Sequence, residues 1–410
     1  MPTATRTFIA VALLALGAVS PPGHAQNPVA DSQVHLREAA AAYRAEDYAA
    51  YARSLETAHE LNPASLYTRH NLAGAYALTG RTDEALRVLR GLVNARVDFG
   101  MAADDDFEAL RALNDFTALT AALADNTRPI VRSIAYYEMP QLDVIPEGIA
   151  ADIETQRFFF GSMRSGNVYV LDAERQLAKF ATVDRSNKRA AIGMTVDTDR
   201  GVLWVVSTAF ELAENHREGD PIETGLIAFD LHTGAKVNEY SAEATGFGLN
   251  DVAVGPNGEL YASGDTLQVL DAERDELVPL VTDPPLFGTN GVAPAAHGRT
   301  LFVSSYPVGI AAIDLATGKQ RFLDTPQDLS LYGVDGMYWD DGDLVAVQNG
   351  IRPWRLVRLR LNDDETAIVE ATIIELANEA ITPTTGAIVE DKIYLLGQGP
   401  APAAKPAHLP

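Results

Sequence analysis

Four oxygen-bearing side chains occupy equivalent places in a pattern that repeats along the C-terminal part of the chain. Each comes directly before a short run of alternating apolar and polar residues; the four are Glu147, Asn250, Asn290 and Asp335. Two carboxylates and two amides supply hard oxygen donors, and Ca²⁺ binds about six to eight such oxygens in loose geometry. No histidine or cysteine recurs at this place, which disfavours zinc. If the four runs begin side by side in the fold, the sequence predicts one bound Ca²⁺.

Each of the four residues taken alone also fits an ordinary strand start or turn. Asn-Gly and Asp-Gly are frequent hairpin turn dipeptides, and Glu147 follows a proline and simply opens a strand in this interpretation. The metal interpretation therefore depends on the four residues falling at the same point of four different repeats. It requires a fold that brings strand starts together.

The repeat consists of inner and outer hairpins. Six inner hairpins are aligned by their first residues, namely Glu147, Gly193, Asn250, Asn290, Asp335 and Thr385. Each passes a polar turn and enters an apolar strand, as at 203–205, and such turns between apolar runs predict hairpins. Outer hairpins, such as the one that begins at 226–230, lie between them. The repeats are about 40–60 residues long, which is typical of four-stranded propeller blades.

These hairpins predict a six-bladed β-propeller over residues 128–399, because the strands are not separated by the helices that a parallel sheet needs. The innermost strands of a propeller start around its central axis, so their first residues converge at one mouth. The sixth inner hairpin has no outer pair after it. We expect the segment from Ile130 to Tyr137 to supply an outer strand there and to close the ring, which removes an exposed edge.

Residues 32–125 carry helical periodicity and predict a small all-α domain. The stretch 71–86 resembles a tetratricopeptide repeat, with Leu72 and Tyr76 on one helix face, a turn at Gly80, and Ala85 packing back from a second helix. The expected fold class is therefore an α + β multidomain protein, with a tetratricopeptide-like domain before the all-β propeller. The helical part is either a spacer packed on the propeller or a concave surface for a protein or peptide partner.

Both chain ends differ in composition from the rest. Residues 1–25 contain Arg6, an apolar run over 8–19 and small residues at the end, which is the layout of a secretory signal peptide; a retained membrane anchor is the alternative. Periplasmic or secreted localisation follows, with no membrane span after cleavage. Residues 400–410 are rich in proline and alanine and predict a disordered tail.

Bulk composition excludes two classes of partner and one kind of chemistry. The net charge of −24 argues against binding to nucleic acid or to an anionic membrane. The chain has no cysteine, so it has neither disulfides nor thiol chemistry.

The motifs around the four oxygen donors resemble those of a known family. They are Pro146-Glu147-Gly148, Asn250-Asp251, Asn290-Gly291 and Asp335-Gly336-Met337, and over about 145–398 they are similar to the senescence-marker-protein-30/gluconolactonase-like calcium propellers. More distantly, they resemble diisopropylfluorophosphatases and paraoxonases. The resemblance implies that the four residues bind one Ca²⁺ in the tunnel and that Asp335 acts as general base or nucleophile. It also implies hydrolysis of lactones or related esters.

One position departs from the family pattern. Family members that act on sugar lactones often carry an arginine where this chain has Gly248, so the resemblance leaves a sugar substrate in doubt. Thr384 and Thr385 are expected to reach the mouth from the sixth hairpin and to bind substrate.

The sequence thus supports two functions. The first is an exported, Ca²⁺-dependent hydrolase of a small lactone or ester. The second is a non-catalytic periplasmic scaffold in which propeller and helical repeats bind a protein or peptide. The natural substrate is left open.

Overall fold

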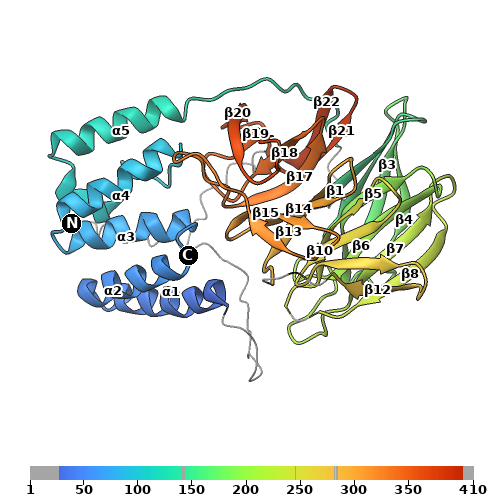
Figure 1. Ribbon diagram of the computed structural model, residues 1–410, viewed down its shortest axis with the longest axis horizontal. Coiled ribbons are helices and arrows are strands. Elements are labelled where there is room, and N and C mark those ends of the chain that lie inside the picture. The colour runs from blue at the N-terminus through green and yellow to red at the C-terminus, as the bar shows by residue number, and fades with distance from the viewer. Residues whose placement is uncertain (1–26, 140–143, 245, 281, 283–284, 400–410) are drawn as a thin grey trace, which may run out of the picture.

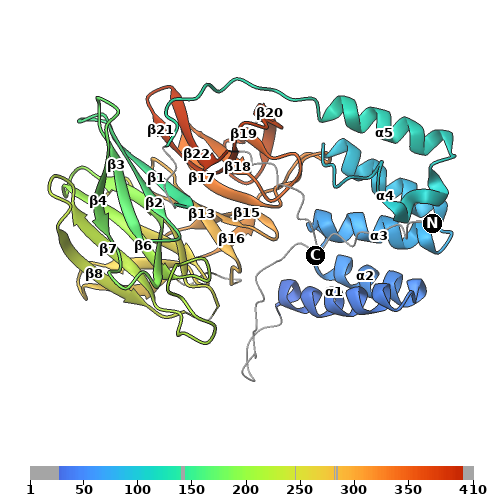
Figure 2. The same ribbon diagram turned by 180° about the vertical axis from the view of Figure 1, so that it is seen from behind.

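The structure is a computed structural model that describes residues 27–139, 144–244, 246–280, 282 and 285–399. The predicted signal peptide (1–25) and tail (400–410) lie outside the described residues. A helical region and a β region lie side by side (Figures 1 and 2). Among the described residues, no helix is both long and apolar enough to cross a bilayer.

The helical region contains five α-helices and one 3₁₀ helix. Their bounds are α1 Pro28–Arg44, α2 Tyr48–Leu61, α3 Leu66–Leu78, α4 Thr82–Asn94, η1 Asp105–Leu110 and α5 Asn114–Asn126. The first three begin at polar caps, because Asn27, Asp47 and Ser65 accept hydrogen bonds from first-turn N–H groups. The predicted helical region is confirmed, and its assignment to tetratricopeptide repeats stays a prediction.

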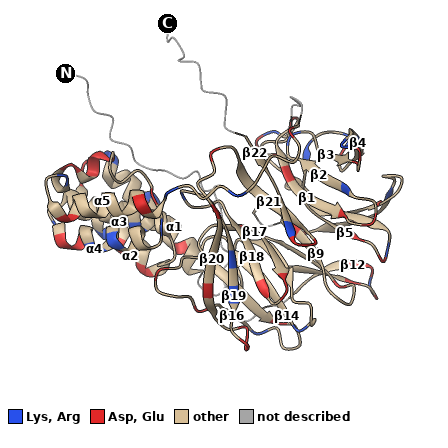
Figure 3. Ribbon diagram, turned by 90° about the horizontal axis from the view of Figure 1, so that it is seen from above, with Lys and Arg blue, Asp and Glu red and all other residues tan. Residues whose placement is uncertain are grey.

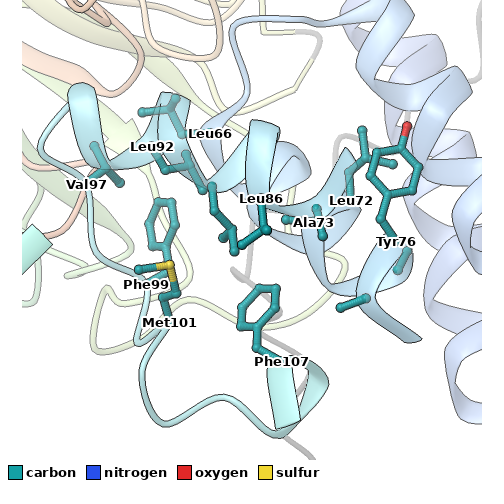
Figure 4. Close-up of a cluster of buried hydrophobic side chains, with 14 of the residues drawn as sticks. Leu66, Leu72, Ala73, Tyr76, Leu86, Leu92, Val97, Phe99, Met101 and Phe107 are labelled. Atoms are coloured by element: carbon teal, nitrogen blue, oxygen red, sulfur yellow. The ribbon is translucent and has the colours of Figure 1, made fainter. Parts of the chain in front are cut away.

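One apolar core holds these helices together. Leu72 of α3 and Ala85 of α4 are buried in it, as their spacing predicts, and Phe107 of η1 is fully buried below them. Figure 4 shows Leu72, Leu86 and Phe107 converging from different elements. A buried hydrogen bond of 2.8 Å from the Tyr43 hydroxyl to the Asp106 carboxylate ties α1 to η1.

In the described part of the chain, the β region has five four-stranded sheets and one two-stranded sheet. The first two are β1 Pro146–Asp152, β2 Arg157–Ser162, β3 Asn167–Leu171 and β4 Leu177–Thr182, then β5 Arg189–Asp197, β6 Val202–Ala209, β7 Thr224–Asp230 and β8 Lys236–Ala242. The next two are β9 Leu249–Val254, β10 Leu260–Gly264, β11 Gln268–Asp271 and β12 Glu276–Pro279, then β13 Thr289–Pro294, β14 Thr300–Ser305, β15 Gly309–Asp314 and β16 Gln320–Phe322. The last are β17 Val334–Asp340, β18 Asp343–Gln348, β19 Arg355–Leu361 and β20 Ile368–Leu376, followed by the pair β21 Thr382–Val389 and β22 Lys392–Gln398.

The propeller therefore has five blades and not the six that the sequence predicted. The hairpin β21–β22 remains a two-stranded sheet, and its first strand packs between the inner strands β17 and β1. The predicted outer strand from Ile130 to Tyr137 does not form. Ile130 makes a single bridge to Leu376 at the end of β20, and Ser133 is then held by the buried Glu375 carboxylate through N–H···O and O–H···O bonds of 2.9 and 2.6 Å. These bonds attach the start of the segment to the fifth blade, and the segment forms no strand beside β22.

Every inner strand carries a β-bulge near its start. The first bulge residues are Glu147, Ile192, Asn250, Asn290, Asp335 and Thr384. A bulge bends the strand and changes the direction of a side chain. In this propeller the bulges lie at equivalent positions of the inner strands. The sequence alignment was wrong by one residue in two hairpins, because it began them at Gly193 and Thr385.

The second bulge residue is a glycine in four of the six strands, where neighbouring inner strands approach closely. A Cβ atom on Gly148, whose φ is +70°, would lie 2.0 Å from the Ile192 carbonyl oxygen. One on Gly291 would lie 2.3 Å from the Asp335 carbonyl oxygen. No side chain fits there, so glycine lets each bulge pack against the first bulge residue of the next strand.

The helical region and the propeller share a buried contact. Arg355 of β19 is 2% exposed and donates hydrogen bonds to Gln348 Oε1 at 2.6 Å, to the Ser330 carbonyl at 3.1 Å and, across the interface, to the Ala95 carbonyl at 3.1 Å. Burial lowers the pKa of its guanidinium to about 10. Three neutral acceptors thus stabilise a buried cation at the join of the two parts.

We expect Arg355→Leu to lower the free energy of unfolding by about 2–4 kcal/mol, because it leaves buried acceptors without a donor. Urea unfolding followed by circular dichroism measures the change. Arg360→Leu on the same strand is the matched control: Arg360 forms an exposed ion pair with Glu370, which contributes at most about 1 kcal/mol. Equal effects of the two variants would contradict this role for Arg355.

Candidate functional site

Three carboxyl groups meet around the propeller axis. Glu147 comes from β1, Asp251 from β9 and Asp335 from β17, and each acts electrostatically on at least one of the others. All three side chains are partly exposed to solvent. They are nevertheless surrounded by so much protein that burial is the largest cause of their pKa shifts. Residues that line a narrow, water-reachable opening have both properties.

Burial shifts the titration of all three groups in the same direction. Burial raises the pKa of Glu147 well above its usual range, and the charge of Asp335 adds to the shift. Burial raises the pKa of Asp251 to about 7, although hydrogen bonds from the backbone of Val252 and Val292 oppose it. Burial also raises the pKa of Asp335 to about 6, opposed by hydrogen bonds from Asn349 and Asn290. Charged forms are therefore costly here unless positive charge is added.

Amide and hydroxyl groups surround Asp335. Asn349, just after β18, donates one hydrogen bond to Asp335 Oδ2 and another, of 3.2 Å, to the Pro383 carbonyl. Its own Oδ1 accepts a hydrogen bond of 3.3 Å from the Tyr306 hydroxyl. The Tyr338 hydroxyl accepts a 2.5 Å hydrogen bond from the Gly386 N–H, which ties β17 to β21.

The structure brings most of the sequence-predicted residues to this place. Glu147 and Asp335 interact electrostatically, and Asn290 hydrogen-bonds Asp335. Asn250 occupies the equivalent bulge position of β9 and is half-buried. Thr384 approaches Glu147, and its hydroxyl favours the charged carboxylate, although no well-aligned hydrogen bond forms. Metal and substrate binding by these residues stays a prediction.

Thr385 stays a predicted substrate-binding residue. It follows the bulge residue of β21, and its hydroxyl oxygen is buried without a hydrogen-bond partner among the described residues. Thr384, and not Thr385, therefore occupies the first bulge position of this hairpin. The first bulge residues of the six inner strands, hereafter the ring of bulges, include Glu147, Asn290 and Asp335.

Sequence reasoning missed Asp251, Tyr338 and Asn349. Asp251 stands at the second bulge position, where four other hairpins have glycine, and this break in the pattern was a readable signal. Its Oδ1 accepts a 2.8 Å hydrogen bond from the Val252 N–H. Tyr338 and Asn349 gave no such signal, because their roles depend on contacts between blades.

Gly248, the position at which sugar lactonases of the resembled family often have arginine, is fixed by its surroundings. Its φ is +82°, and an added Cβ would lie 2.8 Å from the side chain of Thr224. Its N–H donates a 3.0 Å hydrogen bond to Asp265. A side chain here would be strained and crowded, so a sugar-reading arginine does not fit this backbone.

The charge of the three carboxyl groups suits a hard cation such as Ca²⁺. None of the ion pairs formed by the described residues involves Glu147, Asp251 or Asp335, so their negative charge has no Lys or Arg partner. Within the described residues, no three histidine or carboxylate side chains are grouped tightly enough to hold a metal ion on their own. An ion at this place would therefore also need amide, hydroxyl or water oxygens, and Asn290 and Thr384 supply the first two.

Figure 3 shows acidic and basic residues spread over both parts of the molecule. A cavity of about 480 Å³ between the outer parts of the first two blades is lined by four of the basic residues, namely Lys179, Arg185, Arg189 and Lys236. It contains none of the axial carboxylates and does not belong to this site.

No family model matches the chain, and no curated protein is significantly similar to it. Solved structures give low-identity matches. A gluconolactonase from Xanthomonas campestris is 15% identical, with 63% of this chain and 84% of that chain covered and a TM-score of 0.44. Virginiamycin B lyase from Staphylococcus aureus is 14% identical (64% and 80% covered, TM-score 0.45). The calcium-binding protein regucalcin from Agrobacterium tumefaciens is 15% identical (60% and 78%, TM-score 0.42). Likeness at this level is no argument for a shared activity.

We expect the melting temperature of the cation-free protein to fall as the pH rises from 5 to 8. A carboxyl whose pKa is raised in the folded state stabilises the fold below its usual pKa, and this stability is lost as the pH passes the raised values of about 6 and 7 for Asp335 and Asp251. Asp251→Asn removes one such group, so its melting temperature should fall less steeply. The exposed turn variant Asp199→Asn is the control and should keep the wild-type slope. An unchanged slope in Asp251→Asn would contradict the assignment.

Proposed function

We propose that this protein is an exported, Ca²⁺-dependent hydrolase that acts on a small lactone or ester at the propeller axis. The observation that carries the proposal is the group of three half-buried carboxyl groups at the inner-strand bulges, which have no Lys or Arg partner among the described residues. Such a group is costly for a fold to keep unless a cation binds there. Export rests on the composition of residues 1–25.

Four residues would hold the ion: Glu147, Asn250, Asn290 and Asp335. A bound Ca²⁺ would act as a Lewis acid that polarises the substrate carbonyl. Asp335 is the general base, because its carboxylate is oriented by Asn349 and Asn290 and is free to take a proton from a water molecule near the axis. Direct attack by the same carboxylate is the alternative for the first step.

The ring of bulges also indicates the kind of substrate. Its position in the second blade is filled by Ile192, which is 6% exposed and belongs to an apolar cluster against which Met163 and Phe210 pack. Polar donors therefore occupy one part of the ring and an apolar wall another. With Gly248 closed to an arginine, this arrangement favours an ester or lactone with an apolar substituent over a polyhydroxylated sugar lactone.

We expect Asp335→Asn to lower kcat/KM at least a hundredfold for every accepted substrate, which is the usual scale for loss of a positioned base. A panel of lactones and esters, assayed with and without Ca²⁺, measures this. Asp363→Asn, an exposed carboxylate in the loop after β19, is the control and should keep wild-type rates. Wild-type turnover by Asp335→Asn would refute the mechanism.

The same panel separates hydrolase from scaffold. If the wild-type protein hydrolyses nothing in the presence of Ca²⁺ but retains one protein or peptide partner, the non-catalytic function holds instead. In that case the ion would serve only the fold, and Ca²⁺ would still raise the melting temperature by mass action.

A further inference from the structure

Three loops at the rim of the fourth and fifth blades are tied into one unit, hereafter the rim knot. It consists of Tyr306 after β14, Tyr332–Gly333 before β17, and Asn349–Gly350 after β18. The Gly333 N–H donates to the Tyr306 carbonyl at 2.8 Å, and the Gly350 N–H donates to the Gly333 carbonyl at 3.0 Å. Two backbone hydrogen bonds thus connect the three loops in series.

The rim knot determines how the Asn349 amide is oriented. A Cβ on Gly350 would lie 2.5 Å from the Gly333 Cα and 2.6 Å from the Tyr306 hydroxyl oxygen, so the Tyr306 hydroxyl packs directly on this glycine. From there it donates to Asn349 Oδ1 at 3.3 Å. Because Oδ1 is the acceptor, the Nδ2 group of Asn349 faces Asp335 and Pro383 and donates to both.

The helical region contacts each of the three loops. Asn62, at the end of α2, donates a 3.1 Å hydrogen bond to the carbonyl of Pro307, next to Tyr306. The rings of Tyr67 in α3 and Tyr332 lie edge to face, 6.1 Å apart. The Asp98 N–H donates to the Arg352 carbonyl, two residues beyond Gly350, at 2.6 Å. The helical region therefore contacts the rim knot directly at Tyr332, and it contacts Pro307 and Arg352 within two residues of the other two parts.

We infer that Asn349 is a positioning residue for the Asp335 carboxylate, and that the helical region is the clamp that keeps the rim knot, and with it Asn349, in place. This role rests on the proposed function, in which Asp335 is a ligand of the ion. It gives the helical region a task inside the chain: the helices support the site through three loops.

The size of the expected effect follows from other metal sites. Groups that hydrogen-bond a ligand without touching the ion fix its direction, and their loss typically costs about 10–100-fold in metal affinity. Asn349 fits that description, because it binds the Asp335 carboxylate from the side of the fifth blade. Tyr306 acts one contact further away, so its loss should cost less.

The test is a Tb³⁺ titration of the full-length protein, with luminescence excited through tyrosine and reversed by competing Ca²⁺. Asn349→Leu should weaken Tb³⁺ binding at least tenfold, and Tyr306→Phe, which removes one oxygen atom, about threefold or more. Asn238→Leu and Tyr240→Phe are matched controls from the second blade, where the Asn238 amide binds the Tyr240 hydroxyl and this hydroxyl binds Asp275. Both controls should bind Tb³⁺ as the wild type does.

A second pair of variants tests the clamp. Tyr67→Leu removes the ring that meets Tyr332 and should also weaken Tb³⁺ binding severalfold. Tyr43→Leu disturbs the helical core through Asp106 and should leave Tb³⁺ binding unchanged. Weakening by both would show that the effect comes from loss of helical stability, and it would overturn the clamp.

The outcomes separate this inference from the proposed function. If the wild-type protein binds no Tb³⁺, the metal site fails and the positioning role fails with it. If the wild type binds Tb³⁺ and Asn349→Leu binds it equally, only the positioning role fails. Melting temperatures without metal identify a variant that does not fold; if Asn349→Leu is such a variant, Tyr306→Phe decides the question.

Discussion

The close approach of neighbouring inner strands is the constraint on which the rest of the structure depends. In four of the six inner strands the bulge packs against the first bulge residue of the next strand, and glycine at the second bulge position allows this distance. The same bulges bring Glu147, Asn290 and Asp335 of three different strands close together. Packing of the inner strands and assembly of the site therefore depend on the same bulges. A shift of one bulge by one residue would separate the strands and would turn Glu147 or Asp335 away from the site. Two inner strands lack this glycine, and in one of them Asp251 places its carboxylate against the backbone of the next strand.

Much of this arrangement was readable in the sequence, since it depends on local signals. Period-two alternation and polar turns identified the inner hairpins, and the resulting repeat placed Glu147, Asn290 and Asp335 together. What failed depends on pairing between distant segments. The segment from Ile130 to Tyr137 forms no strand; its start binds Glu375, more than two hundred residues away in sequence, and β21 and β22 are left without an outer pair. The position of each bulge is likewise determined by the strand it faces, and in the second hairpin it begins at Ile192 and not at Gly193.

At the site, the Asp335 carboxyl accepts hydrogen bonds from amide groups of two different segments. Asp335 is held by Asn290 from one neighbouring inner strand and by Asn349 from the loop that follows β18. Burial alone would favour the protonated acid, whereas the two amides and a cation favour the carboxylate. The protonation state of Asp335 therefore depends on its burial, on the amides of Asn290 and Asn349, and on whether a cation is bound.

The docking of the helices on the fifth blade also constrains the order in which the chain folds. The hydrogen bond from Arg355 to the Ala95 carbonyl spans 260 residues, and it joins the helical region to a strand that is synthesised much later. The helices can form early, because their contacts are local. Their propeller-facing residues, such as Tyr67, must then stay uncovered until the fifth blade has emerged. During that interval the nascent protein exposes a surface that a chaperone can bind and that an incomplete propeller cannot cover.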